Sequence, residues 1–204
     1  VTTSVLAVFV CLYAAAGDDR LGKSFHALFQ FQLAGINGAF LTGDLFNLFV
    51  CFEILLIASY ALLLHGLGPK RLRASLQYVI INLVGSGLFL LAAGLFYGVT
   101  GTLNMADLSY RVSLAEGDEL HLLQVAGWIL LLVFGLKAAV LPLHFWLPHA
   151  YASASIPVAA LFAVMTKVGL YAILRTTGLT FVDVPTFGTG LLFFLALLTL
   201  LVGM

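Results

Sequence analysis

The chain has 204 residues, of which 62% are hydrophobic and 9% are charged, and its mean hydropathy is +1.13. Soluble domains are roughly half apolar and a quarter charged, so this composition excludes a soluble domain and indicates an integral membrane protein. Nine Lys and Arg residues balance nine Asp and Glu residues, so there is no basic excess to indicate a nucleic-acid partner. Cys11 and Cys51 lie inside apolar runs and support neither a disulfide framework nor a cysteine metal site.

A spanning helix needs about 20 apolar residues, so the chain has room for six or seven spans. Apolar stretches between polar, Gly or Pro breaks predict spans near residues 1–16, 25–42, 45–65, 75–99, 121–141 and 156–178, and the start of another from about 188. The stretches do not alternate every second residue, which favours helices over barrel strands. We therefore expect an all-α, polytopic transmembrane bundle that forms one unit over residues 1–204. Because both ends lie within apolar runs, we expect a piece of a longer protein.

The second and third predicted spans are separated only by Thr42, Gly43 and Asp44. A break this short predicts two antiparallel neighbouring helices. Asp44 is well placed to cap the N-terminus of the third span, because its carboxylate can accept from the first free backbone N–H groups.

Basic residues in the predicted loops indicate the orientation of the chain. Five fall on one side, and two fall on the other: Arg20, Lys23, Lys70, Arg71 and Arg73 against Arg111 and Arg175. Cytoplasmic loops carry an excess of Lys and Arg, so this bias predicts that the 18–23 and 70–73 loops are cytoplasmic. The acidic stretch 100–120 is then an outer loop.

Three charges, Glu53, Lys137 and Lys167, lie well inside apolar spans. A charge at mid-bilayer costs about 2.5–3.5 kcal/mol on insertion scales, so such residues need internal partners or water and are candidates for function. One acid with two amines suits proton handling. Desolvation favours the uncharged amine of Lys137, whereas a nearby Glu53 carboxylate favours the charged amine, so movement between them would switch proton binding. The alternative is a structural ion pair that holds the helices in register.

The predicted fifth span contains a second unusual feature, because Lys137 is followed by the sequence LPLHFWLPHAY with Pro142 and Pro148. Proline interrupts a helix, so we expect a broken helix over Lys137–Pro148. Transporters bind ions at such breaks, where freed backbone groups face a wet cavity. His144 lies at the break and is a candidate proton relay. The alternative is that His144 binds loop carbonyl groups, which is also the role we expect for His149.

Sparse polar residues repeat at helical spacing in two other spans. The two sets are Tyr78, Asn82 and Ser86, and Lys167, Tyr171 and Arg175. Such stripes either line a wet internal path or join helices by hydrogen bonds. The seventeen phenylalanines are expected to face lipid.

Three long motifs resemble a known family. They are GINGAFLTGDLFNLFVCFEILLIASYALLLHG over residues 35–66, GLKAAVLPLHFWLPHAYASA over 135–154 and PVAALFAVMTKVGLYAILR over 157–175. Together they resemble the antiporter-like membrane subunits shared by respiratory complex I and the multisubunit Mrp antiporters. Within that superfamily they look most like the D subunit of the Mrp antiporter.

The resemblance implies a role for each intramembrane charge. Glu53 and Lys137 match the family's glutamate and lysine that form an ion pair, Lys167 matches the lysine that leads to the central polar axis, and His144 matches a histidine of the proton path. The family's full subunit has about fourteen helices in two inverted five-helix repeats, so we expect this chain to contain the first repeat.

The resulting prediction is a subunit of a monovalent cation (Na⁺ or K⁺)/proton antiporter, a secondary transporter and not an enzyme, in the cell membrane. Its expected partners are other subunits of the complex, the lipid bilayer and the ions, with no nucleic acid, no metal site and no cofactor. One alternative is a proton-pumping subunit of a complex I-type NADH:quinone oxidoreductase, which would use the same charges. The other is a scaffold subunit without transport.

Overall fold

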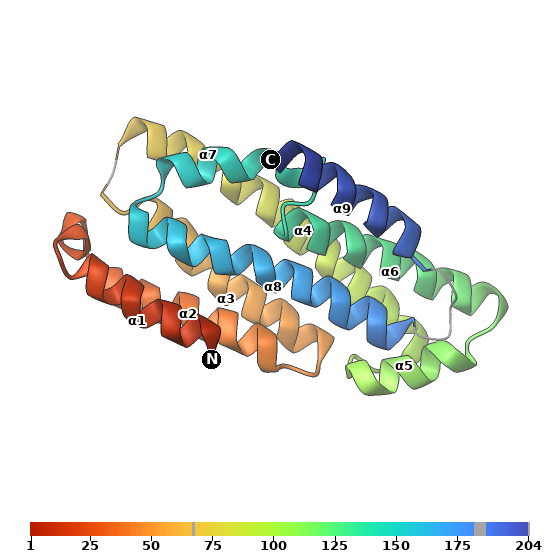
Figure 1. Cartoon of the computed structure of the whole chain (residues 1–204). Helices are drawn as coiled ribbons and strands as arrows, with labels where there is room; N and C mark the ends of the chain where they lie inside the picture. Colours follow the sequence, from red (N-terminus) through yellow and green to blue (C-terminus); the bar gives the residue numbers. More distant parts are fainter. Residues whose placement is uncertain (67, 182–186, 204) are drawn as a thin grey trace.

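The chain folds into a bundle of helices in the computed structural model, which describes residues 1–66, 68–181 and 187–203 (Figure 1). These residues form nine α-helices and two short 3₁₀ helices, with no strand among them. In chain order they are α1 Thr2–Ala14, η1 Asp18–Leu21, α2 Phe25–Leu41, α3 Leu45–Leu63, α4 Pro69–Thr100, α5 Met105–Leu114, α6 Gly117–Lys137, η2 Leu143–Phe145, α7 Trp146–Ser153, α8 Ile156–Thr180 and α9 Thr189–Gly203. The all-α prediction is confirmed.

In the described part of the chain, four helices are long and apolar enough to cross a membrane, namely α3, α4, α6 and α8. They correspond to the predicted spans 45–65, 75–99, 121–141 and 156–178. The predicted spans 1–16 and 25–42 correspond to shorter helices, because α1 has 13 residues and α2 has 17. That these two helices cross the membrane stays a prediction. Most of the link between α8 and α9, residues 182–186, lies outside the described residues.

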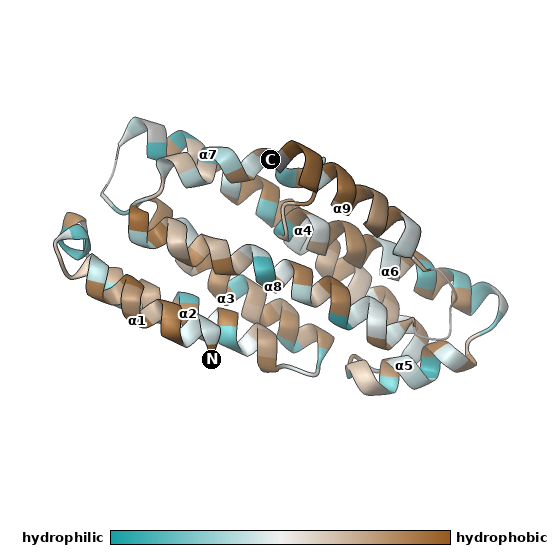
Figure 2. Ribbon diagram, viewed as in Figure 1, coloured by the Kyte–Doolittle hydropathy of each residue, from teal (hydrophilic) through white to brown (hydrophobic). Residues whose placement is uncertain are grey.

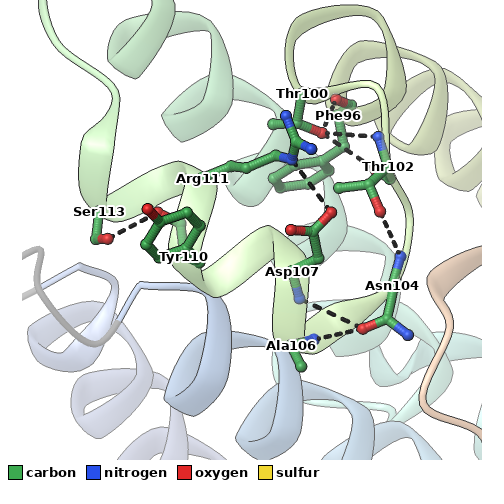
Figure 3. Close-up of polar contacts among 9 residues, drawn as sticks. All are labelled: Phe96, Thr100, Thr102, Asn104, Ala106, Asp107, Tyr110, Arg111 and Ser113. Atoms are coloured by element: carbon green, nitrogen blue, oxygen red, sulfur yellow. Dashed lines mark hydrogen bonds and ion pairs between the residues drawn. The ribbon is translucent and has the colours of Figure 1, made fainter.

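The predicted outer loop 100–120 contains a helix, α5, that the sequence analysis missed. Asn104 caps it by accepting hydrogen bonds from the backbone N–H groups of Ala106 and Asp107, at 3.0 and 3.3 Å (Figure 3). Asp107 also pairs with Arg111 at 3.1 Å, one turn along the helix. Three of its apolar residues, Met105, Leu108 and Val112, are buried. The cap, the ion pair and the buried face together stabilise a helix that is too polar to read as a span.

Backbone hydrogen bonds tie two turns together at one end of the bundle. Asp44 caps α3 by accepting from the Asn47 N–H at 2.8 Å, as predicted. The Leu45 N–H donates to the Leu103 carbonyl at 2.8 Å, and the Met105 N–H donates to the Gly43 carbonyl at 2.9 Å. The α2–α3 turn and the α4–α5 turn therefore lie side by side (Figure 1).

The basic loops meet at the opposite end of the bundle (Figure 1). The His65 ring Nε2 lies 2.9 Å from the Asp18 carbonyl oxygen, and Arg71 donates to the His65 carbonyl. Residues 70–73 were predicted to form a loop but belong to the N-terminal part of α4. They lie at the same end as residues 18–23, as the predicted orientation requires (Figure 1). Which side of the membrane they face stays a prediction.

Phenylalanines fill much of the core, so the expectation that they face lipid is wrong for many of them. Seven are at most 2% exposed: Phe25, Phe29, Phe52, Phe89, Phe96, Phe134 and Phe162. The Phe52, Phe89 and Phe134 rings pack together from α3, α4 and α6, with centroids 5.2–6.2 Å apart. The apolar outer surface is supplied largely by leucine, isoleucine and valine together with phenylalanines such as Phe31 (Figure 2).

Candidate functional site

The helix α6 ends at Lys137, so the predicted break directly after this lysine is confirmed. Ala139 has a left-handed backbone with φ of 56°. The Ala139 N–H donates to the Leu136 carbonyl at 3.2 Å, and the Val140 N–H donates to the Gly135 carbonyl at 2.9 Å. These are the two bonds of a Schellman motif, which normally has glycine at the left-handed position. Lys137 is therefore held in the last turn of a terminated helix.

Side chains from other elements satisfy backbone groups that the break sets free. The Trp146 indole Nε1 donates to the Leu136 carbonyl at 2.9 Å, and Trp146 is 1% exposed. The Leu141 N–H donates to Thr199 Oγ1 on α9 at 3.0 Å. Irregular backbone at membrane depth is tolerated only where such partners exist, so α7 and α9 make the break possible.

A glycine on α8 allows the helix to pack against the broken segment. A Cβ atom on Gly169 would lie 2.6 Å from the Ala138 backbone nitrogen and 2.9 Å from the Lys137 carbonyl carbon. Real Cβ atoms do not approach backbone this closely, so only glycine fits here without a shift. Gly169 follows Lys167 by two residues, and the sequence analysis gave it no role.

Lys137 is buried and has no hydrogen-bond partner among the described residues for its Nζ atom. Its side chain is 4% exposed, and Nζ lies 5.0 Å from the centroid of the Phe52 ring. A cavity of about 10 Å³ adjoins it, about the size of one water molecule. The cavity is lined by Phe52, Leu55, Leu56, Asn82, Lys137, Trp146 and Met165. An amine in such surroundings gains little from being charged.

Glu53 lies on α3, half-buried, and its Oε1 atom accepts a hydrogen bond from the Ser86 hydroxyl on α4. The two ion pairs in the described part of the chain join His26 to Asp19 and Arg111 to Asp107. The expected direct pair between Glu53 and Lys137 is therefore not formed in this structure. The two residues still belong to one neighbourhood, because Phe52, next to Glu53 in the chain, contacts Lys137.

Lys167 does not line the small cavity beside Lys137. It is exposed on this chain, and its Nζ donates to Thr166 Oγ1 at 3.5 Å. It lines a pocket of about 660 Å³ between α8 and α9, together with the broken segment Ala138–Val140. The structure thus brings Lys167 to the broken segment, in a pocket that Lys137 does not line.

The two histidines of the broken segment differ in their contacts. His144 lies half-buried in η2, and its Nδ1 atom is buried without a partner in residues 1–66, 68–181 and 187–203. His149 is exposed, and its Nδ1 lies 3.2 Å from the Phe145 carbonyl oxygen. The prediction that a histidine binds a backbone carbonyl group is therefore met by His149. Nδ1 of His144 makes no such contact among the described residues.

The polar stripe of α4 faces the bundle interior. Tyr78 OH lies 2.9 Å from Ser59 Oγ on α3 and donates to Met165 Sδ on α8 at 3.4 Å. Gln32 on α2 also donates to Met165 Sδ, at 3.7 Å. Apart from the 3% exposed Met165, these side chains are 0% exposed. The i, i+4, i+8 spacing in the sequence identified Tyr78 as part of a polar stripe. No pattern in the sequence indicated that Gln32 and Ser59 would join Tyr78 and Met165 in this hydrogen-bonded group.

The second polar stripe joins helices. The Tyr171 hydroxyl donates to the Phe40 carbonyl of α2 at 2.9 Å, and Arg175 Nη1 reaches the same carbonyl at 3.4 Å. Arg175 also donates to the Tyr171 hydroxyl. This part of the stripe holds the C-terminal end of α2 against α8, which is the structural alternative of the sequence analysis.

Comparison with known proteins shows the family to which the chain belongs. The family model described as "NADH:quinone oxidoreductase/Mrp antiporter, TM" matches residues 42–204. The chain belongs to this family. The resemblance to the D subunit of the Mrp antiporter is confirmed by relatives that carry that name.

Three similar proteins define this relationship. The chain is 52% identical over 179 residues to the D subunit of a probable K⁺/H⁺ antiporter of Rhizobium meliloti (strain 1021), a match that covers 88% of this chain and 33% of that protein. It is 47% identical over 205 residues to the D subunit of the Na⁺/H⁺ antiporter of Bacillus subtilis (strain 168), a match that covers 99% of this chain and 41% of that protein. A chain in the structure of the Mrp complex from Dietzia sp. DQ12-45-1b superimposes with a TM-score of 0.79 and 36% identity, over 88% of this chain and 34% of that chain. The chain thus spans between a third and two fifths of the length of these relatives.

Proposed function

We propose that this chain is part of a D subunit of a monovalent cation/proton antiporter and provides a proton half-channel in which Glu53 and Lys137 form a switch. The observation that carries the proposal is the state of Lys137. Its amine is buried at the end of a broken helix, faces a water-sized cavity and lacks a partner in the described part of the chain. A bilayer-buried amine of this kind costs free energy, which a purely structural role does not explain.

The switch follows from the chemistry of an amine and a carboxylate. While Glu53 is bound to Ser86, the surroundings of Lys137 favour the uncharged amine and release of its proton. When Glu53 approaches Lys137, its negative charge favours the ammonium form and uptake of a proton. Alternation between the two arrangements moves one proton per cycle.

His144 and Lys167 extend the proposed path on either side of the break. Nδ1 of His144 is buried without a hydrogen-bond partner among the described residues, and Lys167 lines the pocket beside the broken segment. The remaining path, the other subunits, and the crossing of Na⁺ or K⁺ belong to the rest of the complex in the cell membrane. One relative is named for K⁺/H⁺ antiport and another for Na⁺/H⁺ antiport, so the experiment below uses both cations.

The second candidate is a proton-pumping subunit of a redox complex. It is supported by the family description, which covers NADH:quinone oxidoreductase as well as the Mrp antiporter. The same residues would serve, with quinone reduction as the source of energy. The named relatives favour the antiporter.

The test uses inverted membrane vesicles that contain the complete complex. After respiration has acidified the lumen, NaCl or KCl is added and the relaxation of the pH gradient is followed with a fluorescent dye. We expect Lys137→Ala to abolish salt-dependent relaxation, because the amine is the proton carrier. Lys23→Ala, in an exposed loop, is the matched control and should behave as wild type. Unimpaired antiport in Lys137→Ala and in Glu53→Gln would overturn the proposal, and NADH-driven pumping that depends on Lys137 would favour the redox complex.

A further inference from the structure

The proposed switch does not explain the contact between Glu53 and Ser86. Ser86 is 6% exposed, and its hydroxyl donates to Glu53 Oε1 from the neighbouring helix α4. A serine hydroxyl in a helix commonly bonds a carbonyl one turn back, as Thr100 does to Phe96 in the same helix. The hydroxyl of Ser86 instead binds the carboxylate of Glu53 on the neighbouring helix.

The face of α4 that carries Ser86 also reaches Lys137. Asn82 precedes Ser86 by one helical turn, is 1% exposed and lines the small cavity beside Lys137. Helix α4 packs against both α3 and α6, which carry Glu53 and Lys137. One face of one helix therefore contacts the carboxylate directly and borders the cavity of the amine.

We propose that Ser86 is a positioning residue that holds Glu53 away from Lys137 and so sets the balance between the two arrangements of the switch. This inference rests on the proposed function. In this proposal, the Glu53 carboxylate leaves the Ser86 hydroxyl when it approaches the Lys137 amine. The strength of the Ser86 contact then decides how often Lys137 is left without a partner and releases its proton.

Two titratable residues of the described chain lie close to Glu53 in the fold. Tyr60 lies two turns further along α3, and Lys137 of α6 contacts Phe52, the residue before Glu53. From α4, the residues at this level are the neutral Asn82 and Ser86. A hydrogen bond from a neutral donor to a carboxylate shifts such an equilibrium by about tenfold or more. Ser86 is thus strong enough to set the balance.

The experiment measures antiport as a function of pH in inverted vesicles that contain the complete complex. In Ser86→Ala, Glu53 is free to pair with Lys137, whose charged form then persists to higher pH. We expect the pH of half-maximal antiport to rise by about one unit. Ser86→Thr keeps the hydroxyl and should restore the wild-type profile. Ser75→Ala is the matched control, because Ser75 lies on the same helix, is 3% exposed and has no hydrogen-bond partner among the described residues.

Two further variants separate this inference from the proposed function. In a Glu53→Gln background, Ser86→Ala should change neither the level of residual antiport nor its pH dependence, because the group that Ser86 positions is gone. A wild-type profile in Ser86→Ala, or a shift that persists without Glu53, would overturn the role of Ser86 while leaving the switch intact. Normal antiport in Lys137→Ala would overturn the switch itself. If Ser86→Ala fails to assemble, Ser86→Cys is used, since its weak donor and similar size predict a smaller shift in the same direction.

Discussion

At the scale of single residues, the site depends on polar atoms whose partners come from distant parts of the chain. Trp146 is the clearest case, because its indole N–H reaches back ten residues to the Leu136 carbonyl at the end of α6. The Leu136 carbonyl also accepts a hydrogen bond from the Ala139 N–H. The Trp146 indole therefore adds a further hydrogen bond to this carbonyl. It fixes the last turn of the helix that carries Lys137.

We predict that Trp146→Phe keeps the fold but loosens this turn. The ring volume is largely kept, whereas one buried hydrogen bond is lost, which costs about 1 kcal/mol. The measurement is the thermal unfolding midpoint of the purified complex, which should fall. Trp128→Phe is the control, because Trp128 is 41% exposed. An equal fall in both variants would contradict a specific role for the indole N–H of Trp146.

Sequence could identify the charged residues of the site but not their contacts. Glu53, Lys137 and Lys167 stand out because charges are rare in apolar spans, and Pro142 marks the break. The contact of Glu53 with Ser86 and not with Lys137 depends on how α3, α4 and α6 pack, which no local pattern encodes. The isolation of Lys137 has the same origin.

At the scale of secondary-structure elements, the site depends on how closely the backbone of α8 approaches the end of α6. Helix α8 crosses the end of α6 at Gly169, where a side chain has no room. Close contacts between small residues are a general basis of helix association in membranes. Here the contact also holds α8 against the broken segment, whose residues Ala138–Val140 line the pocket of Lys167.

We predict that Gly169→Ala destabilises the complex by about 1–3 kcal/mol, because the added methyl group would collide with backbone and force α8 away. Gly178→Ala, on the same helix, is the matched control. A Cβ atom there meets nothing within 4 Å, and alanine favours a helix, so stability should be unchanged or slightly higher. The two variants are compared by thermal unfolding and by the amount of assembled complex in membranes. A harmless Gly169→Ala would refute the tight contact.

At the scale of the whole molecule, the two ends of the bundle differ in charge and in structure. One end gathers the basic loops around η1, and the other carries α5 with its acidic flank, which includes Glu116, Asp118 and Glu119 (Figures 1 and 2). The positive-inside rule assigns the first end to the cytoplasm.

We predict that Glu116→Cys is labelled by a membrane-impermeant maleimide in intact cells. Arg20→Cys should be labelled only after the cells are permeabilised. Both positions are exposed, so accessibility reports the side of the membrane. The measurements use a complex in which Cys11 and Cys51 are replaced by serine, and the same complex without either introduced cysteine is the control. The reverse labelling pattern would overturn the assigned orientation.

The sequence by itself determined the membrane setting, the all-helical fold, the positions of the four long spans, the break after Lys137 and the residues that resemble the antiporter family. These features follow from local composition, from proline and from motifs that are continuous in the chain. Only the tertiary structure decided that Glu53 binds Ser86, that Lys137 Nζ has no hydrogen-bond partner among the described residues and that seven phenylalanines are at most 2% exposed. Hydrophobicity reports that a helix prefers lipid or a core, but which face packs against which neighbour depends on the shapes of all the helices together.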